Sequence, residues 1–234
     1  MAGRGVLTMN EGRTLLAMLQ HGDSFFPSGS VSFSWGIETL GADGRIVKAP
    51  DVERFVTHQL RGRWATSERP VLCAAHAAGG DPAWVLAADN LMEANSLAHE
   101  QREGSKRMGA ALLNIHARLG TAGAKAYQAR VRAGEAPGHV AVVQGLLWDA
   151  LGLDLTSACH MAAHGLSVGL LGAALRLGLI GHVDCQAILS RLHETIEDIL
   201  HAPALPLSAI HAYAPAADIA MMRHEIQETR LFSN

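Results

Sequence analysis

The apolar residues of this chain recur at steps of three and four, and this helical period constrains the fold more than any other feature. Val52, Phe55, Val56 and Leu60, for example, would line one face of a helix. Alanine, leucine and glycine dominate, whereas the β-branched and aromatic residues that favour strands are sparse. With 234 residues, the chain is long enough to bury one large core. The sequence therefore predicts an all-α protein with a single globular multi-helix domain, a helical bundle.

Turn-forming residues divide the helical pattern into segments. A short helix is expected to carry Phe33, Ile37 and Leu40 on one face, before a glycine ends it. The long helical pattern over 82–119 is predicted to be either one helix or two helices that meet near Asn95.

One stretch, residues 165–175, is apolar or small almost throughout. It is shorter than the roughly 20 residues that span a bilayer, and Arg176 ends it, so we interpret it as part of a central core helix. Gly165, Gly169 and Ala173 lie four residues apart and give this helix a face of small residues. Such a face suits ordinary core packing, a closely packed helix pair or the seam of a dimer.

Charge and cysteine content limit the classes of partner. The net charge is −3, so no basic surface is expected to attract nucleic acid or acidic lipid. The cysteines, Cys73, Cys159 and Cys185, are widely spaced and contain no C-x-x-C pair, which indicates reduced thiols. Glu11 and Arg13 interrupt any signal-peptide pattern. We expect a cytoplasmic protein with no nucleic-acid or membrane partner.

The motifs of common enzyme classes fail here. No lysine follows a glycine as a P-loop requires, and Gly3-Arg4-Gly5 lacks the third glycine of a Rossmann site. Residues 165–169 read G-x-S-x-G, the elbow that presents a nucleophilic serine in hydrolases, here Ser167. The preceding residues continue a helical pattern rather than a strand, which favours a packing role for these glycines. We therefore predict no catalytic residue and no enzyme.

A metal site is possible at one pair of histidines. His160 and His164 lie four residues apart on one helix face, beside Cys159, and these donors suit nickel, copper or zinc. Two ligands make a weak site, and thirteen histidines make chance pairs common. We therefore predict no metal ligand and no cofactor in the chain itself, and keep His160 and His164 as the alternative.

The last twenty residues differ in character from the rest. Over 215–234, apolar side chains such as Met221, Met222 and Ile226 alternate with charged ones, and the segment ends near Leu231. Two interpretations are open: a helix that closes the core of its own chain, or a tail that docks onto another protein. We divide the chain into an all-helical domain over 1–214 and a docking tail over 215–234.

Four motifs resemble those of one protein family. Asp23-Ser24-x-Phe26-Pro27-x-Gly29, followed by Ser34-x-Gly36-x-Glu38, resembles the N-terminal signature of the urease accessory protein F (UreF) family. The other motifs are Glu100-x-Arg102-Glu103-x-Ser105-x-x-Met108-Gly109, Pro137-Gly138-His139 with Gly145 and Gly152, and Arg223-His224-Glu225 with Arg230-Leu231-Phe232-Ser233. The similarity covers nearly the whole chain. Val31 and Phe33 depart from the family, which commonly has an aromatic residue and a histidine there.

The resemblance implies an all-helical protein that forms a homodimer and has no catalytic group. Such a protein is a scaffold that bridges UreD, also called UreH, and the GTPase UreG for nickel insertion into apo-urease, and it modulates the GTPase. Nickel is then handled by the complex, and the tail becomes ordered against UreD. The residues that the resemblance assigns to partner binding are Asp23, Ser24, Pro27, Gly29, Glu38, Arg102, Glu103, Arg223, His224, Glu225, Arg230, Leu231 and Phe232. For each of them, turn formation or an internal ion pair is the alternative role.

Overall fold

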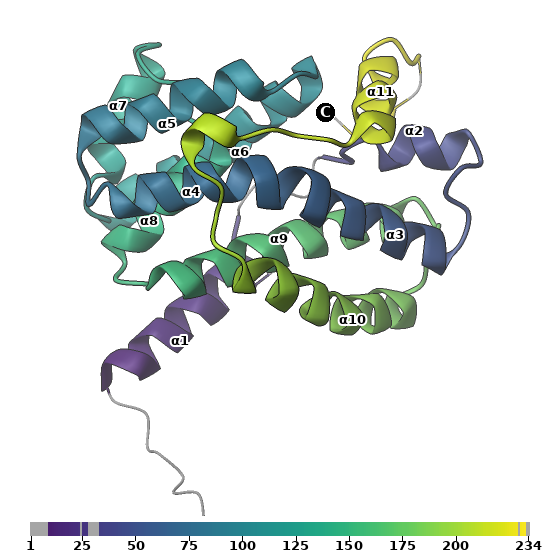
Figure 1. The fold of residues 1–234 in the computed structure, drawn as a ribbon, viewed down its shortest axis with the longest axis horizontal. Helices are drawn as coiled ribbons and strands as arrows, with labels where there is room; N and C mark the ends of the chain where they lie inside the picture. Colours follow the sequence, from purple (N-terminus) through teal and green to yellow (C-terminus); the bar gives the residue numbers. More distant parts are fainter. Residues whose placement is uncertain (1–8, 24, 28–32, 229, 233–234) are drawn as a thin grey trace, which may run out of the picture.

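The computed structural model describes residues 9–23, 25–27, 33–228 and 230–232. Over these residues the chain forms one all-helical domain with no strand (Figure 1). The helices are α1 (Met9–Gly22), α2 (Ile37–Ala42), α3 (Ala49–Gln59), η2 (Leu60–Glu68), α4 (Arg69–Ala77), α5 (Pro82–Asn95), α6 (His99–Leu119), α7 (Ala124–Arg132), α8 (Val140–Ala150), α9 (Leu155–Arg176), α10 (His182–His201), η3 (Leu207–Ala209) and α11 (Pro215–His224).

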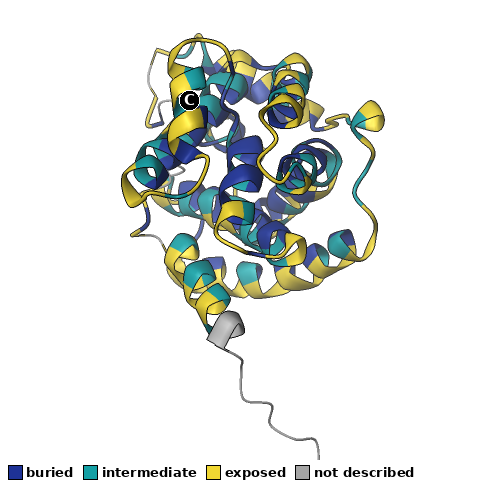
Figure 2. Ribbon diagram, turned by 90° about the vertical axis from the view of Figure 1, so that its left-hand side faces the viewer, coloured by how far each residue is buried: buried dark blue, intermediate teal, exposed yellow. Residues whose placement is uncertain are grey.

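Helix α9 runs through the middle of the bundle and contacts α1, α2, α3, α4, α8 and α10. Asp154 starts it by accepting a hydrogen bond from the amide of Ser157 at 2.8 Å. Buried residues gather around this centre, as Figure 2 shows. By length and composition alone α9 could cross a membrane, but half of its most apolar window is buried inside the bundle. Its position agrees with the predicted core helix over 165–175.

Two glycines permit the closest approaches between elements. A Cβ atom at Gly145 of α8 would overlap the carbonyl oxygen of Leu72 on α4. One at Gly109 of α6 would overlap the carbonyl oxygen of Gly138, in the loop before α8. The buried Asp89 also stabilises this loop. Its carboxylate accepts hydrogen bonds from the amides of Gly138 and His139, the last two residues before α8. Larger side chains at either glycine would push these elements apart.

The helix boundaries decide between two open alternatives and correct one prediction. Helix α5 ends at Asn95 and α6 begins at His99, so the pattern over 82–119 is two helices. Phe33 is buried but lies outside α2, which begins only at Ile37. The reason is the backbone of the preceding residues: Trp35 and Gly36 have φ angles of +53° and +88°, and this left-handed region interrupts a right-handed helix.

A π-helical segment, η2, joins α3 to α4 and positions the C-terminal part of the chain. The carbonyl of Gly62 accepts a hydrogen bond from the amide of Tyr213, and that of Thr66 accepts one from the amide of His211 at 3.1 Å. Arg63 of η2 forms a buried ion pair with Asp218 of α11. The connection from α10 is thereby held along α4, and α11 comes to lie beside α2 (Figure 1).

Candidate functional site

The end of α11 is attached to the bundle by a buried histidine between two carboxylates. His224 is fully buried, and its Nδ1 lies 3.0 Å from both carboxylate oxygens of Glu100 on α6. Its Nε2 lies 3.0 Å from Oε2 of Glu38 on α2. An imidazolium, which donates at both ring nitrogens, matches this arrangement of acceptors. The His224 ring of α11 therefore contacts both α6 and α2, two helices that are distant from it in sequence.

The residues after α11 bind at the same point. The amides of Leu231 and Phe232 donate to the two carboxylate oxygens of Glu38, at 2.6 and 3.2 Å. Arg230 lies 3.4 Å from Glu100, and the guanidinium of Arg176 lies 4.3 Å from the centre of the Phe232 ring. Phe232 is only 4% exposed. We call the set Glu38, Glu100, Arg176, His224 and 230–232 the tail-anchoring site.

The backbone before α2 brings Glu38 to this position. Gly36 faces α11 so closely that a Cβ atom there would come within 2.9 Å of the Ala217 carbonyl oxygen. Its positive φ angle adds a second reason for glycine at this position. On the outer side, Arg223 binds the carboxylate of Asp43 at 2.5 and 3.0 Å and thereby lowers the pKa of that carboxyl group. Exposed ion pairs of this kind contribute little to stability.

The opposite face of the same segment is apolar and faces solvent. Ile226 is 84% exposed and Leu231 is 64% exposed, and Ile219 and Met222 on α11 are also exposed. These residues lie beside charged neighbours on the same segment, such as Arg223. Exposed apolar side chains among charged neighbours are a feature of protein-binding sites. The C-terminal segment therefore has one face bound to its own chain and another face free to contact a second protein.

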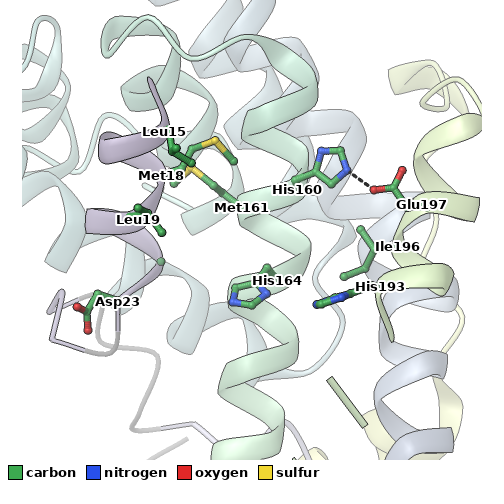
Figure 3. Close-up of a pocket in the computed structure, with 11 residues that line it drawn as sticks. Leu15, Met18, Leu19, Asp23, His160, Met161, His164, His193, Ile196 and Glu197 are labelled. Atoms are coloured by element: carbon green, nitrogen blue, oxygen red, sulfur yellow. Dashed lines mark hydrogen bonds and ion pairs between the residues drawn. The ribbon is translucent and has the colours of Figure 1, made fainter. Parts of the chain in front are cut away.

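A pocket of about 590 Å³ lies between α1, α9 and α10 (Figure 3). His160 Nε2 lies 2.8 Å from Glu197 across the pocket, and the next turn of each helix carries His164 and His193. Burial, and then the proximity of His193, lower the pKa of His164. Within the described part of the chain, no three histidine, cysteine or acidic side chains are arranged to hold a metal ion.

Comparison with known proteins agrees with the resemblance in the motifs. The UreF family model matches residues 46–193, which is more than half of the chain. The chain belongs to the UreF family.

Curated UreF relatives match almost end to end. The urease accessory protein UreF of Trichodesmium erythraeum is 32% identical over 228 residues, which cover 94% of this chain and 96% of that protein. The UreF of Cereibacter sphaeroides strain ATCC 17025 is 31% identical, with coverage of 94% and 98%. That of Yersinia enterocolitica is 28% identical, with the same coverage. The similarity therefore extends well beyond the residues that the family model matches.

The structure brings together some of the residues that the UreF resemblance assigns to partner binding. Glu38, His224 and 230–232 meet in the tail-anchoring site, and Arg223 and Glu225 lie at the adjoining end of α11. Their contacts are with the body of this same chain.

The other assigned residues lie elsewhere. Arg102 on α6 contacts Glu93 at 3.5 Å, and Glu103 contacts Lys106 at 2.7 Å, which lowers the pKa of Glu103. Asp23 and Pro27 are exposed beyond α1, where Asp23 forms a turn by accepting from the amide of Phe25 at 2.9 Å. Ser24 and Gly29 fall outside the residues that the structure describes, as does Val31.

Two members of the tail-anchoring site were missed from sequence. Glu100 begins a motif, but the resemblance assigned a role to Arg102 and Glu103 instead. Its place at the start of that motif was the signal in the sequence. Its burial, which means that the carboxylate needs a partner, is known only from the structure. Arg176 carried no signal, since its contact with Phe232 depends on the folded position of the tail.

The hydrolase-like motif lies inside a helix. Residues 165–169 belong to α9, and no strand precedes them in the described structure. The hydroxyl of Ser167 is fully buried and donates to the Ala163 carbonyl oxygen at 2.8 Å. A nucleophile elbow needs an exposed serine at a strand-to-helix turn. This geometry does not match a nucleophile elbow. The predicted packing role is not seen at Gly165, which is exposed and has open space where a Cβ atom would lie.

Proposed function

We propose that this chain is a non-catalytic scaffold that bridges UreD (UreH) and the GTPase UreG during nickel insertion into apo-urease. The observation that carries the proposal is the two-sided C-terminal segment. Its inner face is held by Glu38, Glu100 and His224, while Ile226 and Leu231 present apolar surface to solvent. We assign this outer face to UreD.

The anchoring of the segment has a consequence for binding. A tail that must become ordered when its partner binds loses conformational entropy at that moment, and this weakens the complex. The contacts of Glu38 with the 231 and 232 amides hold the tail in one conformation before binding. The proposed interface is therefore already formed, and UreD has only to cover the exposed apolar side chains.

The remaining partner assignments extend this proposal. UreG binds a different surface of the same chain, so both partners can be held at once, and the contact modulates the GTPase in the cytoplasm. A homodimer brings two such scaffolds together. On α9, Gly165 has open space where a side chain would lie, whereas Ala173 of the same small-residue face is fully buried, so only the Gly165 end of this face is available for close helix contact. Nickel is cargo of the complex rather than a resident cofactor of this chain.

Binding of purified UreD to surface variants tests the proposal. Ile226→Asp and Leu231→Asp place a charge on the outer face, and we expect each to weaken UreD binding at least about tenfold because the charge would be desolvated. Val183→Asp is the control: Val183 is 83% exposed but lies at the start of α10. Circular dichroism should show unchanged helix content in all three. Equal UreD affinity of the wild type and both outer-face variants would contradict the proposal.

A second candidate function is nickel binding by the chain itself, through His160 and His164. The observation that favours it lies on the facing helix, where His193 and Glu197 are also four residues apart. In the described structure these side chains are not arranged to hold a metal ion, so nickel binding would require them to turn toward one point. Equilibrium dialysis with nickel separates the two functions. Stoichiometric binding that the double variant His160→Ala/His164→Ala loses would support the metal carrier, and absence of binding to the wild type would exclude it.

A further inference from the structure

Two thiols that are distant in sequence meet between α4 and α9. The Sγ atoms of Cys73 and Cys159 lie 3.8 Å apart, and both cysteines are free. The two helices pack directly on each other. We propose that Cys73 and Cys159 form a redox-responsive dithiol, which a peroxide closes to an intramolecular disulfide between α4 and α9. This property is separate from the scaffold function.

The surroundings of Cys159 favour its thiolate. The contact with the Cys73 thiol and the positive charge of the nearby Arg69 guanidinium lower the pKa of Cys159 to about 7. His160, its neighbour on α9, acts in the same direction. The same contact, together with burial, raises the pKa of Cys73. One member of the pair is thus the nucleophile and the other retains its proton.

Arg69 is held in place independently of the thiols. Its two terminal nitrogens donate to the carbonyl oxygens of Ile199 and Ala202, each at 2.8 Å. The positive charge near the dithiol is therefore a fixed feature of the packing between α4 and the end of α10. A fixed cation beside a cysteine is typical of reactive thiols, whereas structural cysteines lie in apolar surroundings.

Solvent access to the cysteine pair and the distance between its sulfur atoms also allow a disulfide to form. Cys73 is partly exposed, so a small peroxide can reach the pair from its side, whereas Cys159 is buried. A disulfide joins sulfur atoms about 2.05 Å apart, so the two atoms must approach by about 1.8 Å. Cys185, the third cysteine, lies on α10 with its Sγ 3.8 Å from the carbonyl oxygen of Leu171. It provides an internal control.

The reaction balances with a peroxide as the oxidant. The Cys159 thiolate attacks one oxygen of hydrogen peroxide, which breaks the O–O bond, forms a sulfenic acid and releases hydroxide. The Cys73 thiol then attacks the sulfenic sulfur, forming the S–S bond, and water leaves. The proton of Cys73 leaves in that water, and the proton that the Cys159 thiol released on ionisation neutralises the hydroxide. Two thiols are oxidised and one peroxide is reduced to two waters. In a reducing compartment such a bond is reversed by low-molecular-weight thiols.

The test is peroxide treatment of the full chain, followed by thiol counting in denaturant and peptide mapping. Trypsin places the three cysteines on different peptides, 64–102, 133–176 and 177–191. We expect two of the three thiols to disappear and a cross-link between the first two peptides to form within a single chain. The rate should rise roughly tenfold from pH 6 to pH 8 as the thiolate forms.

Three single variants make the result specific. Cys73→Ala and Cys159→Ala should each prevent the cross-link, and Cys185→Ala should leave it unchanged. If one of the first two variants fails to fold, the other one and the peptide map still decide the outcome. The proposal is overturned if three thiols remain, if the cross-link joins two chains or involves Cys185, or if the rate does not change with pH.

Discussion

Removing the Glu38 carboxylate should release the end of the chain from the bundle. The substitution Glu38→Ala deletes the acceptor of the 231 and 232 amides, at 2.6 and 3.2 Å, and the contact with His224 at 3.0 Å. Hydrogen bonds to a charged group contribute about 1.5–3 kcal/mol each, but part of this site faces solvent, so we expect a total loss of about 3 kcal/mol. Opening of the tail should then become roughly a hundredfold more frequent.

Amide hydrogen exchange measures this opening directly. In Glu38→Ala, the amides of Leu231 and Phe232 should exchange roughly a hundredfold faster, while amides in the middle of α9 keep their protection. Glu135→Ala is the matched control. It also removes a glutamate, but Glu135 is exposed on another part of the surface, where it forms an ion pair with Arg130 at 3.7 Å. Unchanged exchange at both tail amides in Glu38→Ala would refute the anchoring role of this carboxylate.

Two further predictions concern stability measured by urea unfolding. Gly109→Ala should lower the free energy of unfolding by about 2 kcal/mol because its methyl group overlaps the Gly138 carbonyl. Gly165→Ala places its methyl group in open space, so the free energy of unfolding should stay the same or rise by up to about 1 kcal/mol. Equal effects of the two substitutions would contradict this account. Burial and His21 lower the pKa of His116 from 6.5 to about 4, so the unfolded chain takes up the proton first as pH falls. The free energy of unfolding should therefore fall by about 2 kcal/mol from pH 7 to pH 5, and His116→Gln should not show this decrease. The same pH dependence in the wild type and the variant would refute the prediction.

The fold was predictable because its determinants are local. The apolar period predicted helices throughout, and one of the two alternatives for 82–119 had a break near Asn95, where α5 ends. The α2 boundary was not predictable, because a tryptophan rarely adopts the left-handed backbone that Trp35 has here. Periodicity also gave no sign of the π-helical turns of η2. In this segment the Gly62 carbonyl accepts a hydrogen bond from the amide of Tyr213, about 150 residues later.

The candidate site was predictable only through its motifs. The resemblance selected Glu38, His224 and 230–232, which the structure brings into contact. It could not indicate that Glu100 faces the same histidine, since the two residues are far apart in sequence and meet only in the packed bundle. Arg176 likewise meets Phe232 only when the tail is folded back. Pairings of this kind are long-range properties, which residue types and spacing do not encode.

The most direct test of the scaffold function is co-purification of this chain with UreD and UreG, followed by sizing chromatography. The full-length chain is compared with a form truncated after Thr229, which lacks Arg230, Leu231 and Phe232. We predict that the full-length chain forms a stable complex with both partners, and that truncation removes UreD from it while helix content stays the same. A truncated chain that binds UreD as tightly as the full-length chain would contradict the account.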